Sequence, residues 1–235
     1  MAFSADVRAS VKTRSGVSDS RRIIYKFDIT RSLDGNVSRL IDIAVAATAI
    51  LIVLPVIVLI CLAIALQDGG SPIFVHRRIG RGGRVFPCLK LRTMVQDSED
   101  RLRRHLESDP AARAEWALDQ KLRRDPRVTP LGLFLRKSSL DELPQLFNVV
   151  CGHMSLVGPR PIVPAEVERY GRYMQFYCNV RPGITGLWQV SGRNDVSYRR
   201  RVAMDTIYSR TRWVGGDIWI MVRTVPAVFA SKGSF

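Results

Sequence analysis

The longest uncharged stretch of the chain runs from Ile43 to Leu66, with a single proline at position 55. As a continuous helix, these 24 residues would be about 36 Å long, enough to cross a hydrocarbon core of about 30 Å. Pro55 lies at the middle, where it removes one backbone hydrogen bond and clashes with the preceding turn. The segment is therefore predicted either to bend and leave by the face through which it entered, or to span the membrane.

Basic residues flank this apolar stretch on both sides. Lys26, Arg31 and Arg39 precede it, and Arg77, Arg78, Arg81 and Arg84 follow it. A spanning helix is usually depleted of lysine and arginine on its outer flank, so the charge pattern favours a re-entrant segment. A span is still an alternative, because prolines occur in ordinary spans. The uncharged length disfavours a buried helix of a soluble protein.

Charge and cysteine content narrow the class of protein. The formal charge of +15 indicates an anionic partner: nucleic acid, anionic lipid or a phosphorylated substrate. The four cysteines have no Cys-x-x-Cys spacing, which argues against a zinc site and a disulfide framework. A polar stretch of about forty residues precedes the apolar run, so no signal peptide is predicted. With 235 residues, the chain is long enough to bury a core.

The predicted fold is mainly α with a short β hairpin, in three parts. Residues 1–30 are expected to be a mobile arm, residues 31–67 the re-entrant membrane helix, and residues 68–235 a basic domain at the membrane surface. A short strand or hairpin is predicted over 73–92, and helices over 98–123, 132–150, 165–178 and 196–211. A loop rich in proline and glycine is predicted over 155–164, and a turn-rich loop or hairpin over 181–192. The tail at 213–229 carries two tryptophans and suits either an interfacial amphipathic helix or a core helix.

The adjacent acids Asp141 and Glu142 are the strongest candidates for chemistry, because basic residues surround them in the sequence. On a helix their side chains would diverge by about 100°, so they are expected to divide their roles. One carboxylate could attack a phosphorus atom while the other holds Mg²⁺ together with substrate phosphates. The alternative is capping: Ser139 and Glu142 fit a capping box, and Asp141 fits an N-cap before Pro144.

Five basic residues are candidates for binding phosphate. They are Lys90, Arg92, Arg136, Arg160 and Arg181. The first two would share one face of a strand, and the last two adjoin prolines that fix their backbones. Taken singly, each such residue is more often a surface charge. The three histidines have no metal-binding spacing, and the sequence contains no P-loop motif.

Together, these stretches resemble the monotopic phosphoglycosyl transferases of bacteria, also called bacterial sugar transferases. The matching segments are Lys90-Leu91-Arg92-Thr93-Met94, Arg136-Lys137-Ser138-Ser139-Leu140-Asp141-Glu142-Leu143-Pro144-Gln145, Gly158-Pro159-Arg160-Pro161 and Arg181-Pro182-Gly183-Ile184-Thr185-Gly186. The resemblance extends from about residue 35 to residue 229. It is closest to the enzymes that start exopolysaccharide assembly with a hexose phosphate, and residues 68–235 are then the cytoplasmic catalytic domain.

The resemblance implies a reaction and its site residues. A sugar 1-phosphate, galactose or glucose, would pass from a UDP-sugar to undecaprenyl phosphate, with release of UMP. Asp141 would form a covalent phosphosugar intermediate, Glu142 would bind Mg²⁺, and the basic residues would hold phosphates. The expected location is the cytoplasmic face of the bacterial inner membrane, in contact with its phospholipids. The chain is expected to be a minimal catalytic unit, and homo-oligomerisation is left open.

The sequence departs from the family pattern at three positions. The family's re-entrant helix breaks at a Ser-Pro pair, whereas this chain has Leu54-Pro55 and so lacks the hydroxyl. His153 and His76 stand where an acidic residue and a glutamine are common. The competing hypotheses are a membrane-tethered nucleic-acid-binding protein and a scaffold without catalysis. No aromatic residues interleave with the basic ones, so nucleic acid is not predicted as a partner.

Overall fold

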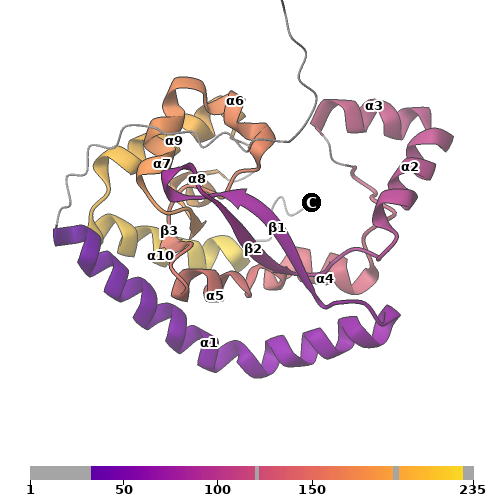
Figure 1. Ribbon diagram of the computed structural model, residues 1–235, viewed down its shortest axis with the longest axis horizontal. Coiled ribbons are helices and arrows are strands. Elements are labelled where there is room, and N and C mark those ends of the chain that lie inside the picture. Colours follow the sequence, from indigo (N-terminus) through magenta and orange to yellow (C-terminus); the bar gives the residue numbers. More distant parts are fainter. Residues whose placement is uncertain (1–32, 120–121, 193–195, 230–235) are drawn as a thin grey trace, which may run out of the picture.

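The computed structural model describes residues 33–119, 122–192 and 196–229, so the predicted arm at residues 1–30 lies outside the described residues. The described chain is mainly helical with a short antiparallel hairpin, as predicted (Figure 1). A long helix runs along one edge, the hairpin lies at the centre, and two helices project as an arm. The other helices lie around the hairpin, with α4, Pro130–Ser138, between it and the long helix.

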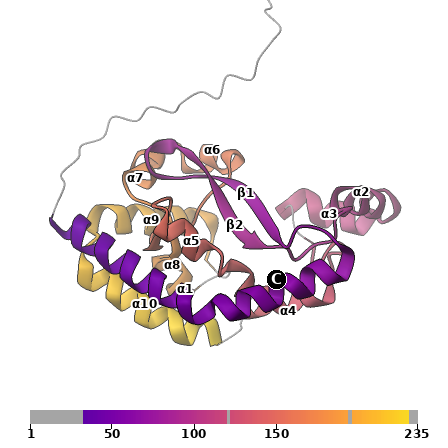
Figure 2. The ribbon, with the colours of Figure 1, turned by 60° about the horizontal axis from the view of Figure 1, so that its bottom comes forward.

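Helix α1, Leu33–Asp68, contains the apolar stretch and the Leu54-Pro55 pair, at which the sequence predicts a break. The helix continues through Pro55 but is curved, and in both views it lies along the outside of the body (Figures 1 and 2). Among the described residues, Asn36–Asp68 is the one helix that is long and apolar enough to cross a membrane. Its apolar side chains are largely exposed, with Leu51 at 76% and Leu66 at 78%. Such exposure distinguishes α1 from the core helix of a soluble protein.

Both ends of α1 are attached to the same body. Near the N-terminal end, the Asp42 carboxylate accepts hydrogen bonds from Ser155 Oγ at 2.7 Å and from the Leu156 amide at 3.0 Å. At the C-terminal end, Arg92 Nη1 donates to Asp68 Oδ2 at 2.9 Å. The apolar middle of the helix therefore lies between two polar anchors.

The hairpin forms as predicted from strands β1, Ile73–Ile79, and β2, Val85–Leu91. Gly82 and Gly83 in the connecting 3-10 turn, Arg81–Gly83, have φ values of 73° and 70°, which glycine adopts without strain. The register pairs His76 with Cys88 and places Arg78 and Lys90 two residues away on their own strands. Since alternate residues share a face, these side chains occupy one side of the hairpin.

A second, parallel strand pair was not predicted. Strand β3, Ser155–Val157, pairs with β4, Gly183–Thr185, in segments that the sequence indicated to be a loop and a turn-rich loop or hairpin, respectively. Three residues are too few to show the alternation that marks a strand. A Cβ atom on Gly183 would lie 2.1 Å from the Gly158 amide nitrogen, so glycine permits the two chains to approach this closely.

The single helix predicted over 98–123 is wrong, because the arm consists of two helices. Helix α2, Ser98–Ser108, ends before Pro110, which begins α3, Pro110–Asp119. Proline cannot continue a helix but is favoured in its first turn, and the Asp109 carboxylate accepts from the amides of Ala111 and Ala112.

The C-terminal half is built mainly from short helices. The helices predicted over 132–150, 165–178 and 196–211 are present, but those over 132–150 and 165–178 are each interrupted. The elements are α4, Pro130–Ser138; η2, Leu140–Glu142; α5, Gln145–Val150; η3, Pro164–Glu166; α6, Val167–Tyr170; η4, Gly171–Tyr173; α7, Met174–Asn179; α8, Leu187–Ser191; α9, Tyr198–Thr211; and α10, Val214–Phe229. The structure confirms the core interpretation of the tail in part, and the interfacial interpretation stays a prediction. Ile220 of α10 is buried in the core, whereas Trp219 is 48% exposed and Trp213, just before the helix, is 62% exposed.

The core lies between the hairpin, α5, β3, α9 and α10. Phe86, Val149, Met154 and Tyr208 are buried in one cluster there. Burying each large apolar side chain contributes about 1.5–3 kcal/mol. Together with the anchors of α1, this cluster fixes the face of the hairpin that carries the basic residues.

Asp205, on α9, is a buried carboxyl group that couples folding to pH. Burial raises its pKa to about 7, although a hydrogen bond from Tyr170 Oη at 2.7 Å and the charge of Arg201 act in the opposite direction. The folded state therefore binds this proton more tightly than the unfolded chain does. The resulting stability is fully present below the ordinary pKa of 3.8 and is lost as the pH rises through about 7.

We expect Asp205→Asn to remove this pH dependence, because the amide still accepts from Tyr170 but does not ionise. Between pH 5 and 7, the variant should gain up to about 1.4 kcal/mol relative to wild type for each pH unit. Thermal unfolding of both proteins in detergent across this range measures the difference. A difference that stays constant with pH would show that Asp205 has an ordinary pKa.

Candidate active site

The acid pair lies on a tight turn between α4 and α5. Ser139 has a φ of 59°, the left-handed conformation that non-glycine residues seldom adopt, and it reverses the chain after α4. Asp141 and Glu142 follow in the 3-10 turn η2. The predicted capping role is wrong: Ser139 makes no side-chain capping bond, and the N-cap of α5 is Pro144. The two carboxylates are therefore not engaged in ending or starting a helix.

Lys90 of β2 joins the two acids. Its Nζ lies 2.5 Å from Glu142 Oε1 and 3.6 Å from Asp141 Oδ2. The side chains of Asp141 and Glu142 are 12% and 24% exposed, so these charges interact in surroundings that water screens only weakly. Lys90, predicted as a phosphate binder, is thus brought next to the acid pair.

The two carboxyl groups have pKa values shifted in opposite directions. Burial raises the pKa of Asp141, and the neighbouring Glu142 charge adds to this, while Lys90 and Arg136 act against it. Burial would also raise the pKa of Glu142, but Lys90 and Arg160 outweigh it and the pKa is lowered. Glu142 is therefore held as an anion, whereas Asp141 is the more basic of the two carboxylates.

Arg136 approaches the pair from α4. Its Nε donates to Thr93 Oγ1 at 2.9 Å, and the Thr93 carbonyl accepts from the Thr129 amide at 3.1 Å. A Cβ atom on Gly132 would lie 2.0 Å from the Thr93 carbonyl oxygen, so only glycine lets α4 pack this closely. Thr93 thus links the end of the hairpin to the helix that carries Arg136.

A cleft opens beside Lys90 and Glu142. Its lining residues are Arg78, Cys88, Lys90, Glu142, Gln145, Arg160, Pro161, Gly183, Ile184 and Gln189. It combines cations at Arg78, Lys90 and Arg160 with the neutral amides of Gln145 and Gln189. Guanidinium groups suit phosphate oxygens, and amides can exchange hydrogen bonds with hydroxyl groups.

Arg78, Gln145 and Gln189 line the cleft but were not predicted as site residues from the sequence. Arg78 Nη1 donates to the Pro161 carbonyl at 3.0 Å, and its Nη2 lies 3.1 Å from His76 Nδ1. The alternation of His76 and Arg78 opposite Lys90 was the available signal, since a hairpin places them on one face. The two glutamines carried no such signal.

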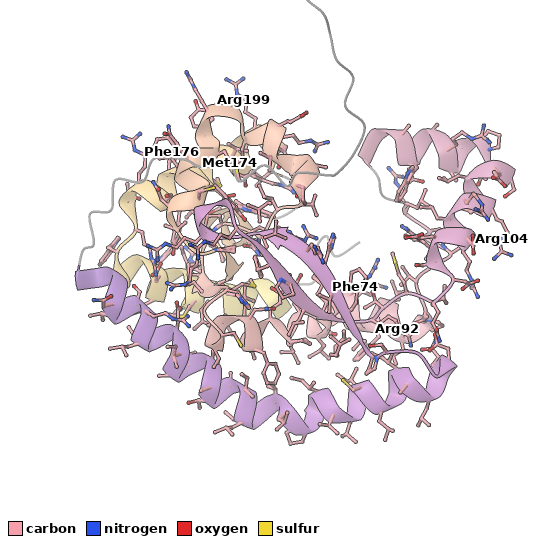
Figure 3. All side chains as sticks on the ribbon, in the orientation of Figure 1. Phe74, Arg92, Arg104, Met174, Phe176 and Arg199 are labelled. Carbon is pink, nitrogen blue, oxygen red and sulfur yellow. The ribbon has the colours of Figure 1, made fainter. Side chains whose placement is uncertain are left out.

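Two predicted phosphate binders lie elsewhere. Arg92, labelled in Figure 3, lies beside the C-terminal end of α1, because β2 ends at Leu91 and the chain turns toward that helix. There its Nη1 donates to Asp68 Oδ2. Arg181 Nε donates to the Gly152 carbonyl at 2.9 Å, near the opposite end of α1. His153 stacks on Phe86 and also lies outside the cleft lining.

By themselves, Asp141 and Glu142 would supply only part of the ligands that a magnesium ion needs. Among the described residues, no three His, Cys, Asp or Glu side chains gather where they could hold a metal. Mg²⁺ is commonly bound by one or two carboxylates together with substrate phosphates and water. Asp141 and Glu142, beside a cleft lined by Arg78 and Arg160, are compatible with this mode of binding.

Comparison with known proteins agrees with this geometry. A family model described as bacterial sugar transferase matches residues 33–231, a range that includes α1, the hairpin, the acid pair and the cleft. The chain belongs to the bacterial sugar transferase family. Membership of this family favours an enzyme over the scaffold and the nucleic-acid-binding alternatives.

Individual bacterial sugar transferases are similar over most of this chain. A UDP-galactose-lipid carrier transferase of Erwinia amylovora is 50% identical over 197 residues, covering 84% of this chain and 41% of that protein. The exopolysaccharide production protein ExoY of Rhizobium meliloti is 47% identical over 205 residues, covering 87% and 91%. An undecaprenyl-phosphate galactose phosphotransferase of Salmonella typhimurium is 48% identical over 197 residues, covering 84% and 41%. The chain thus spans less than half of the first and third relatives and most of ExoY.

Proposed function

We propose that the protein transfers a hexose 1-phosphate from a UDP-hexose to undecaprenyl phosphate, releases UMP, and so starts the assembly of an exopolysaccharide or another glycoconjugate. The proposal rests mainly on the environment of Asp141. Its carboxyl group is buried, has a raised pKa and makes no capping bond. It lies 3.6 Å from Lys90 Nζ, at the edge of the cleft that carries the cations. The names of the galactose-transferring relatives support galactose as the sugar, with glucose as the second candidate.

In the first step, a carboxylate oxygen of Asp141 attacks the phosphorus that bears the sugar. The bond from that phosphorus to the bridging oxygen breaks, and UMP leaves with the bridging oxygen. The enzyme then holds the sugar phosphate as an acyl phosphate. A raised pKa supports this role, because a more basic carboxylate shares its electron pair more readily.

In the second step, a phosphate oxygen of the lipid attacks the same phosphorus. The bond to the carboxylate breaks, Asp141 is regenerated, and the product is a polyprenyl diphosphate sugar. Two displacements at one phosphorus let the donor and the acceptor use one site in turn. The cleft beside Asp141 and α1 below it supply a polar and an apolar approach to that site.

The cations have separate tasks. Lys90 and Arg136 flank Asp141 and stabilise the negative charge that develops on the transferred phosphoryl group. Arg78 and Arg160 line the cleft and bind the remaining diphosphate oxygens. The amides of Gln145 and Gln189 face the same cleft and are suited to the sugar hydroxyls.

Glu142, with its lowered pKa, would hold Mg²⁺ when substrate binds. The ion would neutralise diphosphate oxygens and so assist departure of UMP. Lys90, which pairs with Glu142 at 2.5 Å, would then be free to interact with phosphate.

We further propose that α1 is re-entrant at the cytoplasmic face of the bacterial inner membrane. The support is that Asp42 and Asp68, near its two ends, both bond to the catalytic body. A helix anchored at both ends to one polar body cannot place those ends on opposite sides of a bilayer. Pro55 and the curvature of α1 are consistent with this path, and the exposed apolar side chains would contact phospholipid.

Cysteine labelling tests this topology. Asn36→Cys and Gln67→Cys, both at exposed positions flanking the apolar stretch, are each introduced with the exposed Cys151 replaced by serine. We expect an impermeant maleimide to label both cysteines in inverted vesicles and neither in intact spheroplasts. Labelling of one of them from outside the cell would show that α1 spans the membrane.

The reaction itself is tested by UMP release from a panel of UDP-sugars with undecaprenyl phosphate and Mg²⁺. Lipid-dependent release from one donor is expected, and it would identify the sugar at the same time. No release from any donor would refute the proposed reaction.

A further inference from the structure

Tyr177 of α7 connects the two segments that carry Arg78 and Arg160, although it lies outside the cleft. Its side chain is buried. The hydroxyl donates to the Ile79 carbonyl at 2.7 Å and accepts from the Ile162 amide at 3.2 Å. One hydroxyl therefore uses its donor and an acceptor site on two segments that are far apart in the sequence.

These segments also bond to each other directly. The Ile79 amide donates to the Ile162 carbonyl at 2.9 Å, and the two residues form an isolated antiparallel bridge. Arg78 Nη1 donates to the Pro161 carbonyl at 3.0 Å. Ile79 follows Arg78, and Ile162 lies two residues after Arg160, so the Tyr177 hydroxyl closes a small network in the two segments that carry these arginines.

The two arginines would otherwise tend to separate. Burial lowers the pKa of Arg78, and the nearby positive charge of Arg160 lowers it further. Glu166 Oε2 lies 3.9 Å from Arg78 Nη1 and offsets part of this repulsion. Both arginines line one cleft, so an anion bound between them would relieve the rest. Holding like charges together before the anion arrives is preorganisation, which reduces the free-energy cost of binding.

We propose that Tyr177 is a positioning residue for the donor: its hydroxyl clamps the Arg78 and Arg160 segments at the spacing that a nucleoside diphosphate requires. This inference rests on the proposed function in assigning the cleft to the diphosphate. It predicts that removing the hydroxyl alone weakens diphosphate binding, although Tyr177 itself touches no substrate.

The test uses the full chain in detergent and UDP as the probe, with Mg²⁺ present. We compare wild type with Tyr177→Phe, which keeps the ring and removes both bonds. The matched control is Tyr170→Phe: the Tyr170 ring packs at 5.3 Å from that of Tyr177, is also buried, and its hydroxyl bonds to Asp205 rather than to either arginine segment. Titration calorimetry gives the Kd, and thermal unfolding gives the stability of each variant.

We expect Tyr177→Phe to weaken UDP binding about tenfold, and Tyr170→Phe to change it by less than about twofold despite a comparable loss of stability. In turnover, Tyr177→Phe should raise KM for the donor with kcat within about threefold of wild type. An unchanged Kd in Tyr177→Phe, or equal weakening in both variants, would overturn the proposal. Wild type that binds UDP but releases no UMP from any donor would refute the proposed reaction and leave the binding comparison valid.

If Tyr177→Phe does not fold, hydrogen exchange of wild type measures the same clamp. UDP is expected to slow exchange in residues 77–80 and 159–163 together, because one hydroxyl joins them. Slowing in one of these segments alone would contradict the clamp.

Discussion

Asp141→Asn is expected to lower UMP release by about 10⁴-fold or more, because it removes the oxygen anion that attacks phosphorus. The fold should survive. Asp141 makes no side-chain capping bond, and an amide of the same shape relieves the buried carboxylate of its desolvation. UMP release with saturating lipid and donor measures the loss, and thermal unfolding measures the fold.

Asp205→Asn is the matched control for this loss. It also neutralises a buried aspartate, but on α9 and outside the cleft lining. Turnover within about twofold of wild type is expected for this variant. Retained turnover in Asp141→Asn would rule out the covalent role, and equal losses in both variants would show that any buried charge change disables the enzyme.

Lys90→Met is expected to have the second-largest effect, a decrease in turnover of about 10²- to 10³-fold. The substitution removes the cation that lies against both Asp141 and Glu142. Since Lys90 lowers the pKa of each carboxyl group, its loss leaves both protonated at higher pH. The acid limb of the pH–rate profile should therefore move toward higher pH.

Lys90→Arg separates charge from shape. Arginine keeps the positive charge but not the compact ammonium group that reaches both acids, so we expect the acid limb to stay near its wild-type position while the rate falls. A profile for Lys90→Met with an unshifted acid limb would mean that Lys90 does not control ionisation of the pair.

The parts of the fold that depend on long or periodic patterns could be predicted from the sequence. The apolar stretch of α1 and the alternating strands of the hairpin are such patterns, and both elements form where expected. The acid pair with Lys90 could also be predicted, because the family motifs bring these residues into one site. The positions at which helices end were harder to predict. Pro110 separates α2 from α3, and Ser139 interrupts the helical stretch at 132–150.

Tertiary contacts explain the remaining differences. Arg92 alternates with Lys90 in the sequence, but its partner Asp68 becomes a neighbour only when α1 folds back along the body. The β3–β4 pair consists of three residues on each strand, which is too short for a periodic signal. Tyr177 acts through backbone atoms of Ile79 and Ile162, and no side-chain pattern in a sequence records such bonds.

The covalent intermediate is tested most directly with a UDP-hexose labelled on the phosphate that bears the sugar, in the absence of lipid. The enzyme is mixed with excess labelled donor and quenched, and peptides are mapped by mass spectrometry. We expect one equivalent of UMP per active site and labelled sugar phosphate on the peptide that contains Asp141, discharged when undecaprenyl phosphate is added. UMP that appears only when lipid is present, with no labelled peptide at any time, would contradict the covalent mechanism and indicate direct transfer between the two substrates.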